Sequence, residues 1–190
     1  MTKSELRSIY REKRRVVTSA EHAGKSNAII ERFFHEFDLT AVLKLHCFIS
    51  MRNAGEIDTR PIFERLWIGH PAIETFAPRI DETTGELEAV KFTSTSALKP
   101  NKWNIDEPAD GETSDPGTID LVVVPLLCFD ERGHRAGYGK GFYDRFLKEC
   151  RPDCLRAGLS FFPPVELIED VHAGDIALDV CITPDETYRF

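Results

Sequence analysis

Hydrophobic positions recur at two different spacings along the chain, and the spacing predicts helices first and then alternating strands and helices. In residues 3–17, Leu6, Ile9 and Tyr10 fall on one side at helical spacing, while basic side chains line another side. Residues 19–37 repeat a helical pattern and begin with Ser19, a residue type that is favoured at helix N-termini. Two amphipathic helices are therefore expected before the first strand.

After position 40 the apolar segments become shorter and strand-like. Residues 119–125 form the strongest of these segments, because their continuous β-branched run suits a parallel strand that is covered on both faces. Helical patterns at residues 59–68 and 141–150 lie between the strands, and a long surface loop is predicted at residues 99–118, which are rich in Pro, Gly, Asp and Thr. The other predicted strands are residues 41–50, 72–77, 87–93, 155–160 and 177–183.

Strands that alternate with helices predict an α/β fold with a single open, mostly parallel sheet flanked by helices, in a Rossmann-like three-layer arrangement. The 190 residues are expected to form a single domain. Open sheets of this kind bind ligands beyond the carboxyl ends of their strands. The loops that follow Ser50 and Pro125 should lie at that edge.

The net charge and its distribution along the chain limit the class of ligand that the protein is expected to bind. The net charge of -8 argues against nucleic acid as a partner, yet residues 1–15 carry six basic and two acidic side chains, a local net charge of +4. A small anionic ligand would explain this basic segment, although charged helix faces are more often simply solvated. A charged N-terminus and the lack of a stretch of about 20 apolar residues predict a cytoplasmic protein without a membrane partner, and we expect a monomer.

The segment RAGYGKGFYD, residues 135–144, carries the clearest candidate chemistry. Gly137, Gly139 and Gly141 would let the backbone approach a ligand closely, and a helix N-terminus follows them, which together suit a phosphate group. Arg135 and Lys140 could add charge-assisted contacts to that phosphate. A flexible turn between strand and helix is the alternative interpretation, and the segment is neither a Walker loop nor a GxGxxG fingerprint.

Two carboxylates are candidates for binding magnesium beside such a phosphate. They are Asp144, which could instead cap a helix or form an ion pair, and Asp179 in the last predicted strand. Glu56, in EIDT at residues 56–59 of the segment 52–63, could hold the N–H groups of a heterocycle, although EIDT also has the pattern of a helix cap. Trp103 could be a lid anchor or a stacking surface.

Two classes of enzyme are not supported by the sequence. The six histidines lack metal-ligand spacing, and no nucleophile elbow is present. The five cysteines form no CxxC pair, so we expect reduced thiols that mostly pack in the interior.

Taken in order, these blocks resemble the 5-formyltetrahydrofolate cyclo-ligase family. The similarity is carried by KSELR at 3–7, EIDT at 56–59, NKWNIDEP at 101–108, DLVVVPLLCFDERGHRAGYGKGFYDRFL at 120–147 and LDVCIT at 178–183. The resemblance implies that ATP phosphorylates the formyl oxygen of 5-formyltetrahydrofolate and that N10 then attacks the activated carbon. The products would be 5,10-methenyltetrahydrofolate, ADP and phosphate.

The resemblance also implies roles for individual residues. Arg135 and Lys140 would take part in catalysis, and Asp144 and Asp179 would hold Mg²⁺. Phe142 stands where many members have a tyrosine, so any role of that hydroxyl is absent here. ATP would be bound by Lys3, Arg7, Arg135, Gly137, Gly139, Lys140, Gly141 and Tyr143, and the folate by Glu56, Trp103, Tyr138 and Phe142, with Tyr143 also shaping its pocket.

Three alternatives remain open. A related enzyme could keep the ATP site and act on another substrate, and such a change would show at Glu56, Trp103 and Phe142. A non-catalytic folate- or nucleotide-binding protein would not need the whole set of phosphate and metal ligands. A sugar-phosphate isomerase on a related sheet would require no ATP.

Overall fold

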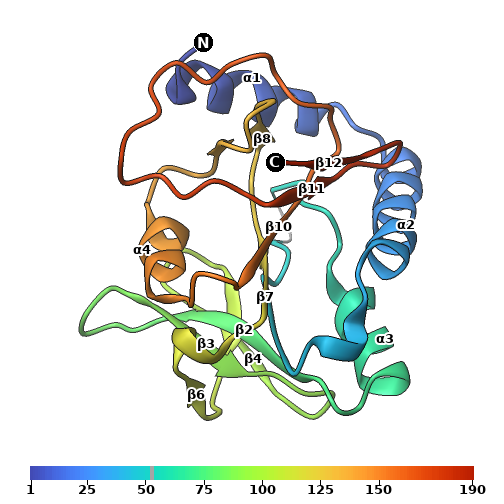
Figure 1. The fold of residues 1–190 in the computed structure, drawn as a ribbon, viewed down its shortest axis with the longest axis vertical. Helices are drawn as coiled ribbons and strands as arrows, with labels where there is room; N and C mark the ends of the chain where they lie inside the picture. The colour runs from blue at the N-terminus through green and yellow to red at the C-terminus, as the bar shows by residue number, and fades with distance from the viewer. Residues whose placement is uncertain (52–53) are drawn as a thin grey trace.

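The computed structural model describes residues 1–51 and 54–190, so the first two residues of the segment 52–63 lie outside the described residues. An eight-stranded sheet runs through the centre, in the order β12-β11-β10-β7-β1-β2-β3-β6 (Figure 1). Strands β11, β10, β7, β1 and β2 pair in parallel, whereas β12 at one edge and β3 near the other run antiparallel to them, and β6 pairs antiparallel with β3. The strands are β1 (Lys44–Cys47), β2 (Glu74–Ile80), β3 (Leu87–Lys91), β6 (Thr113–Ser114), β7 (Leu121–Val124), β10 (Leu155–Leu159), β11 (Val180–Ile182) and β12 (Thr187–Arg189).

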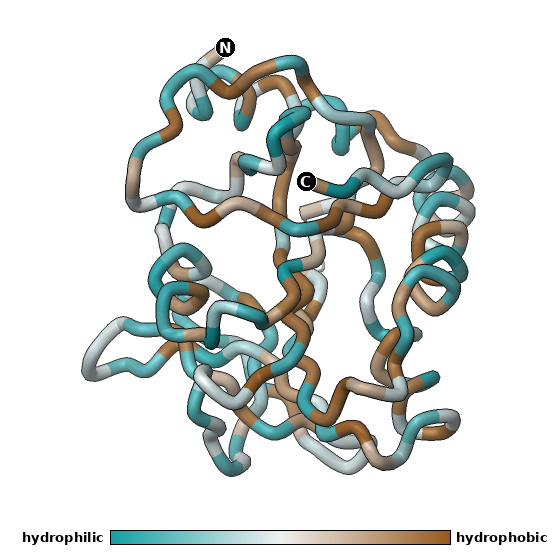
Figure 2. The backbone as a smooth tube through the Cα atoms, viewed as in Figure 1, coloured by the Kyte–Doolittle hydropathy of each residue, from teal (hydrophilic) through white to brown (hydrophobic). Residues whose placement is uncertain are grey.

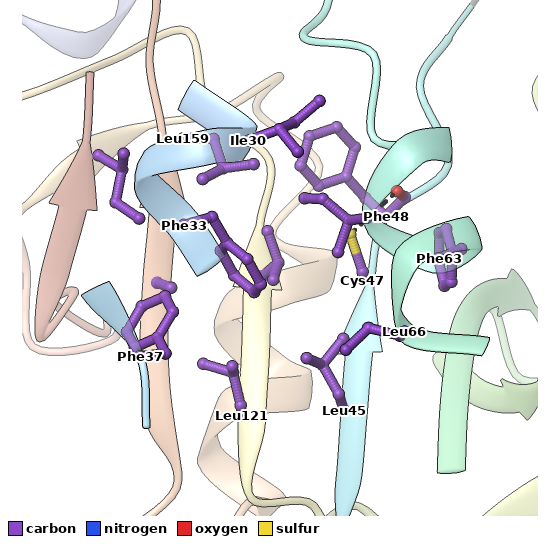
Figure 3. Packing of buried hydrophobic residues seen from close by; sticks show 14 of the residues in the cluster. Ile30, Phe33, Phe37, Leu45, Cys47, Phe48, Phe63, Leu66, Leu121 and Leu159 are labelled. Atoms are coloured by element: carbon purple, nitrogen blue, oxygen red, sulfur yellow. Dashed lines mark hydrogen bonds between the residues drawn. The ribbon is translucent and has the colours of Figure 1, made fainter. Parts of the chain in front are cut away.

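Helices cover both faces of this sheet. Helices α2 (Ser19–Glu36) and α3 (Arg60–Gly69) pack on one face, where Phe33 and Leu66 lie over Leu121 and Leu45 (Figure 3). Helix α4 (Phe142–Glu149) packs on the other face. Along the backbone, apolar residues concentrate in the central strands and polar residues on the outer turns of the helices (Figure 2). The predicted three-layer α/β fold with a mostly parallel sheet is confirmed.

Local sequence explains where the first two helices begin. In α1 (Lys3–Arg15) the Thr2 side chain accepts from the Glu5 backbone N–H, and the Glu5 carboxylate accepts from the Thr2 N–H, a capping box. Thr18 and Glu21 form the same box at the start of α2. The cap is therefore Thr18 rather than the predicted Ser19.

The prediction of one long surface loop at residues 99–118 was wrong. The segment holds β5 (Asp106–Pro108), which pairs with β4 (Leu98–Pro100), then β6 at the edge of the main sheet, and a 3₁₀ turn, Pro116–Thr118. These strands are only two or three residues long and contain residue types that are depleted in strands, so pairing partners rather than local propensity determine them.

Helix α1 lies across one end of the sheet, beside the short hairpin of β8 (Cys128–Phe129) and β9 (Arg135–Ala136) (Figure 1). Leu6 and Tyr10 pack there against Leu127 and Ala136. Two of the basic residues in the N-terminal segment, Lys3 and Arg14, are buried, so this charged segment is not simply solvated. Among the described residues, no helix is long and apolar enough to cross a membrane.

Candidate active site

A cavity of about 740 Å³ opens beyond the carboxyl ends of the central parallel strands. Met51, which follows β1, and Pro125, which follows β7, both line it, in agreement with the edge predicted from the topology. Helix α1, the glycine-rich segment and residues 170–175 form one side of the cavity. All of the predicted site residues except Asp179 line this cavity.

The glycine-rich segment connects β9 to α4 through two residues in the left-handed region. Gly139 has φ 92° and Gly141, the N-cap of α4, has φ 69°, conformations that side chains with a Cβ rarely adopt. A Cβ on Gly139 would also lie only 3.3 Å from Cζ of Arg7. Arg7 in turn donates from Nε to the Gly137 carbonyl at 2.8 Å, so α1 and the glycine segment form one basic wall.

Two of the predicted phosphate ligands already have acidic partners. Lys3 forms an ion pair with Asp175, and Arg135 donates to Oδ1 of Asp144 at 2.8 Å. Burial lowers the pKa of the Arg135 guanidinium, with Asp144 acting in the opposite direction. Lys140 is exposed, and its ammonium group makes no hydrogen bond or ion pair within the described part of the chain. It can therefore reach an incoming anion without giving up a protein partner.

Asp144 and Asp175 are the carboxylates that pair with the side chains of these cations. Oδ1 of Asp144 accepts from the N–H of Ile176, the residue after Asp175, at 3.2 Å. Burial alone would raise the pKa of Asp175, but hydrogen bonds from Lys3 and the His172 N–H outweigh burial and lower the pKa. Oδ2 of Asp144 accepts no hydrogen bond from a described residue, which leaves it available to a cation.

The structure does not bring Asp179 to this pair. Its carboxylate accepts from Nε and Nη2 of Arg156, at 2.8 and 2.5 Å, and from the Arg156 N–H at 2.7 Å. Of the two acids near the C-terminus, the structure thus places Asp175, and not Asp179, in the cavity with Asp144. Asp175 and Asp179 lie within five residues of each other, and no local sequence signal distinguishes their roles.

A buried polar chain links helix α1, the glycine-rich segment and the loop that precedes α3. Nη1 of Arg14 donates to the Tyr138 hydroxyl at 3.1 Å, and this hydroxyl donates to Oε1 of Glu56 at 2.6 Å. Oε2 of Glu56 accepts from the Met51 N–H at 2.7 Å. Burial raises the pKa of Glu56, and these hydrogen bonds with the nearby Arg14 charge oppose the shift.

Within the EIDT segment the capping alternative applies to Asp58, whose Oδ1 accepts from the N–H of Arg60, the first residue of α3, at 3.1 Å. Thr59 is the N-cap of α3 but makes no side-chain capping bond, and its hydroxyl donates to the Phe48 carbonyl instead. Glu56 is only 5% exposed and lines the cavity, so it is not part of a helix cap. Arg14 does not line the cavity but contacts Glu56 through Tyr138. The sequence did not reveal this role, because helical spacing alone does not show which arginine of a charged helix turns inward.

Aromatic and aliphatic side chains form the remaining wall. Trp103 is 42% exposed, and its ring centroid lies 6.0 Å from that of Phe142. Ile80 and Leu87 line the cavity near them. The Tyr143 hydroxyl is buried without a hydrogen-bond partner among the described residues, and burial raises its pKa well above the usual value. One half of the cavity is thus basic and suits phosphate groups, and the other half is apolar and suits a flat heterocycle.

Comparisons with known proteins agree on one family. A family model described as the 5-formyltetrahydrofolate cyclo-ligase family matches residues 1–173. The 5-formyltetrahydrofolate cyclo-ligase of Escherichia coli (strain K12) is 30% identical over 145 residues, covering 72% of this chain and 76% of that protein. The Mus musculus protein of the same name is 28% identical over 152 residues, covering 76% and 73%.

Solved structures give the same result. The NMR structure of Aquifex aeolicus 5,10-methenyltetrahydrofolate synthetase superposes with a TM-score of 0.84 at 28% identity, covering 100% of this chain and 93% of that one. A Mycoplasma pneumoniae 5,10-methenyltetrahydrofolate synthetase, at 21% identity and a TM-score of 0.77 over 97% and 99% of the two chains, shows the shared fold. Asp175 and Asp179 lie beyond the residues that the family model matches, so their placement rests on the structure.

Proposed function

The chain belongs to the 5-formyltetrahydrofolate cyclo-ligase family, and we propose that it uses ATP and Mg²⁺ to convert 5-formyltetrahydrofolate into 5,10-methenyltetrahydrofolate, ADP and phosphate. One observation carries the proposal: a single cavity is lined by the basic glycine-rich wall, by aromatic side chains and by the buried carboxylate of Glu56. ATP and a folate would have to meet in such a space for a phosphoryl group to pass between them.

The reaction needs no nucleophilic side chain. The γ-phosphoryl group moves from ATP to the formyl oxygen, and ADP leaves. The N10 lone pair then attacks the formyl carbon, the C–O bond breaks, phosphate departs with that oxygen, and N10 loses its proton. Phosphoryl transfer of this kind depends on positioning and on neutralising charge. Arg135, Lys140 and Arg7 supply positive charge along the wall where the phosphates would lie.

The carboxylates fit a magnesium ion bound with nucleotide. Mg²⁺ keeps most of its waters and takes one or two protein carboxylates together with phosphate oxygens. Asp144, with an available oxygen, and Asp175 beside it meet that requirement, and no larger group of metal-ligating side chains is found among the described residues. The ion would neutralise charge on the phosphates. On the folate side, Tyr138 and Arg14 hold the Glu56 carboxylate in a fixed position.

The direct test is turnover. Purified protein with ATP, Mg²⁺ and 5-formyltetrahydrofolate should develop the near-ultraviolet absorbance of methenyltetrahydrofolate, with one ADP formed per product. Binding of ATP without any absorbance change would contradict the proposed substrate and favour a relative that acts on another compound.

Lys140→Met tests the assignment of the phosphate wall. Turnover should collapse while the unfolding midpoint stays unchanged, because the Lys140 ammonium has no partner among the described residues. Lys99→Met is the matched control, since Lys99 is exposed on β4 and does not line the cavity. Equal turnover in the two variants would remove Lys140 from the mechanism.

A further inference from the structure

A second buried carboxylate, Glu107 of β5, faces the cavity from the apolar wall. Glu107 is 6% exposed and lines the cavity together with Ile80 and Trp103. It forms no ion pair with a described residue, and the nearby Arg79 is itself held by Glu88 at 2.8 Å. A carboxylate in such surroundings is unfavourable unless donors satisfy both of its oxygens.

One oxygen of Glu107 is satisfied by the protein and the other is not. Oε1 accepts from Nδ2 of Asn101 at 2.7 Å and from the Ile80 N–H at 3.2 Å. Oε2 accepts no hydrogen bond from any residue that the structure describes. The two donors on Oε1 fix the orientation of the carboxylate, so Oε2 is left as a preorganised acceptor at the edge of the apolar half.

We propose that Oε2 of Glu107 accepts a hydrogen bond from the 2-amino group of the pterin ring, and that Glu107 thereby selects the aminopyrimidinone edge of the substrate. This inference rests on the proposed function, which supplies a pterin as ligand. The ring is flat and apolar on its faces, matching the wall of Ile80, Leu87 and Trp103, and it carries N–H donors at one edge. A donor paired with a buried carboxylate gives a charge-assisted hydrogen bond, among the stronger polar contacts in proteins.

Glu107→Gln separates recognition from a structural role. The glutamine carbonyl can still accept from Asn101 and Ile80, whereas a flipped amide would face those donors with its own N–H₂ group. With its carbonyl towards Asn101 and Ile80, the glutamine therefore keeps the local structure. Its N–H₂ group then lies where the pterin also presents a donor. Loss of one charge-assisted hydrogen bond corresponds to roughly 10- to 100-fold weaker binding.

The experiment measures dissociation constants for 5-formyltetrahydrofolate and for ATP by calorimetry. Glu107→Gln should weaken folate binding about 10- to 100-fold, with ATP binding and the unfolding midpoint unchanged. Glu112→Gln is the matched control, because it removes the same charge at an exposed position that does not line the cavity. Unchanged folate affinity in Glu107→Gln overturns the inference.

A ligand variant gives an answer that does not depend on how the protein variant folds. The 2-desamino analogue of 5-formyltetrahydrofolate should bind the wild-type protein about 10-fold or more weaker than the parent compound, and this difference should largely vanish in Glu107→Gln. Equal affinity of the wild-type protein for the two ligands also overturns the inference. Because binding is measured separately from turnover, a protein that binds folate without forming product would contradict the proposed function and still test Glu107.

Discussion

Replacing Arg14 by methionine should destabilise the protein and disturb the Glu56 wall of the cavity together. Arg14 is 5% exposed, and its guanidinium donates to the Tyr138 hydroxyl at 3.1 Å and to the Leu126 carbonyl. Methionine preserves most of the aliphatic stem and removes both donors. The Tyr138 hydroxyl then keeps Glu56 as a partner, but Glu56 loses the cation that acts on it through the phenol.

The magnitude follows from the burial of both charges. Removing one partner of a buried charge pair costs roughly 3–5 kcal/mol, and the intervening hydroxyl places Arg14→Met near the lower end, at about 3 kcal/mol. In a chain of this length each kcal/mol lowers the melting temperature by about 2–4 °C, so a fall of about 6–12 °C is expected.

The loss should also depend on pH. Burial already raises the pKa of Glu56 above its ordinary value of 4.5, so folding favours the protonated form relative to the unfolded chain. A group of this kind favours folding below its unfolded pKa, and that contribution is lost as pH rises through the folded pKa. Without Arg14 the folded pKa of Glu56 rises further. The loss in free energy of unfolding caused by Arg14→Met should therefore be smallest below pH 4.5 and grow above it.

A double-mutant cycle tests this coupling by urea unfolding at acid and neutral pH. Wild type, Arg14→Met, Glu56→Gln and the double variant should show an interaction of at least about 1 kcal/mol at neutral pH, falling towards zero in acid. Arg15→Met is the matched control, since Arg15 is exposed and pairs with Glu12 on the surface. Additivity within about 0.5 kcal/mol at neutral pH would refute the proposed link between Arg14 and Glu56.

Three further predictions concern the metal pair, the glycine segment and the core. Asp175→Asn should raise the Mg²⁺ concentration for half-maximal turnover about tenfold or more, and it should also lower the unfolding midpoint because it leaves Lys3 without its partner. Asp179→Asn should lower the unfolding midpoint and leave the Mg²⁺ requirement unchanged; equal Mg²⁺ requirements in the two variants would contradict the assignment. Gly139→Ala places a Cβ on a residue with φ 92° and against Arg7, a strain of about 1–2 kcal/mol, so the KM for ATP should rise about tenfold. An unchanged KM would argue against a close approach of this backbone to ATP. Burial lowers the pKa of His46 from 6.5 to about 3, so the stability present above pH 6.5 should fall by about 1.4 kcal/mol per pH unit as the pH drops towards 3. The free energy of unfolding should therefore depend less steeply on pH in His46→Leu than in the wild type, and an identical slope would contradict this cause.

The parts of the fold that were predicted correctly are those in which local pattern and burial agree. The continuous apolar run of β7 is fully buried between the helix layers, from Leu121 to Val124, as its composition requires. The parts that were missed depend on distant partners. Strand β5 consists of Asp106, Glu107 and Pro108, none of them a good strand former, and its pairing with β4 defines it.

Site residues divide in the same way. The glycine segment could be found because three glycines beside Arg135 and Lys140 form a local pattern. Glu107 could not, because its significance lies in a free oxygen on a buried carboxylate, which depends on where Asn101 and Ile80 lie in the fold. The sequence thus pointed to the glycine segment and to Glu56, which both line the cavity, whereas Arg14 and Glu107 could be found only in the three-dimensional structure.

The two acids near the C-terminus show why charge alone does not identify a metal ligand. Asp179 is held by two side-chain bonds from Arg156 on the neighbouring strand, and using it as a ligand would break both and leave Arg156 without its partner. Asp175 is paired with Lys3, a residue expected to bind phosphate. If Lys3 turns to the nucleotide and Asp175 to its cation, each charge exchanges one opposite partner for another, and no buried charge is left uncompensated. The ion pair between Lys3 and Asp175 would thus keep both charges neutralised until the proposed ATP and Mg²⁺ bind together.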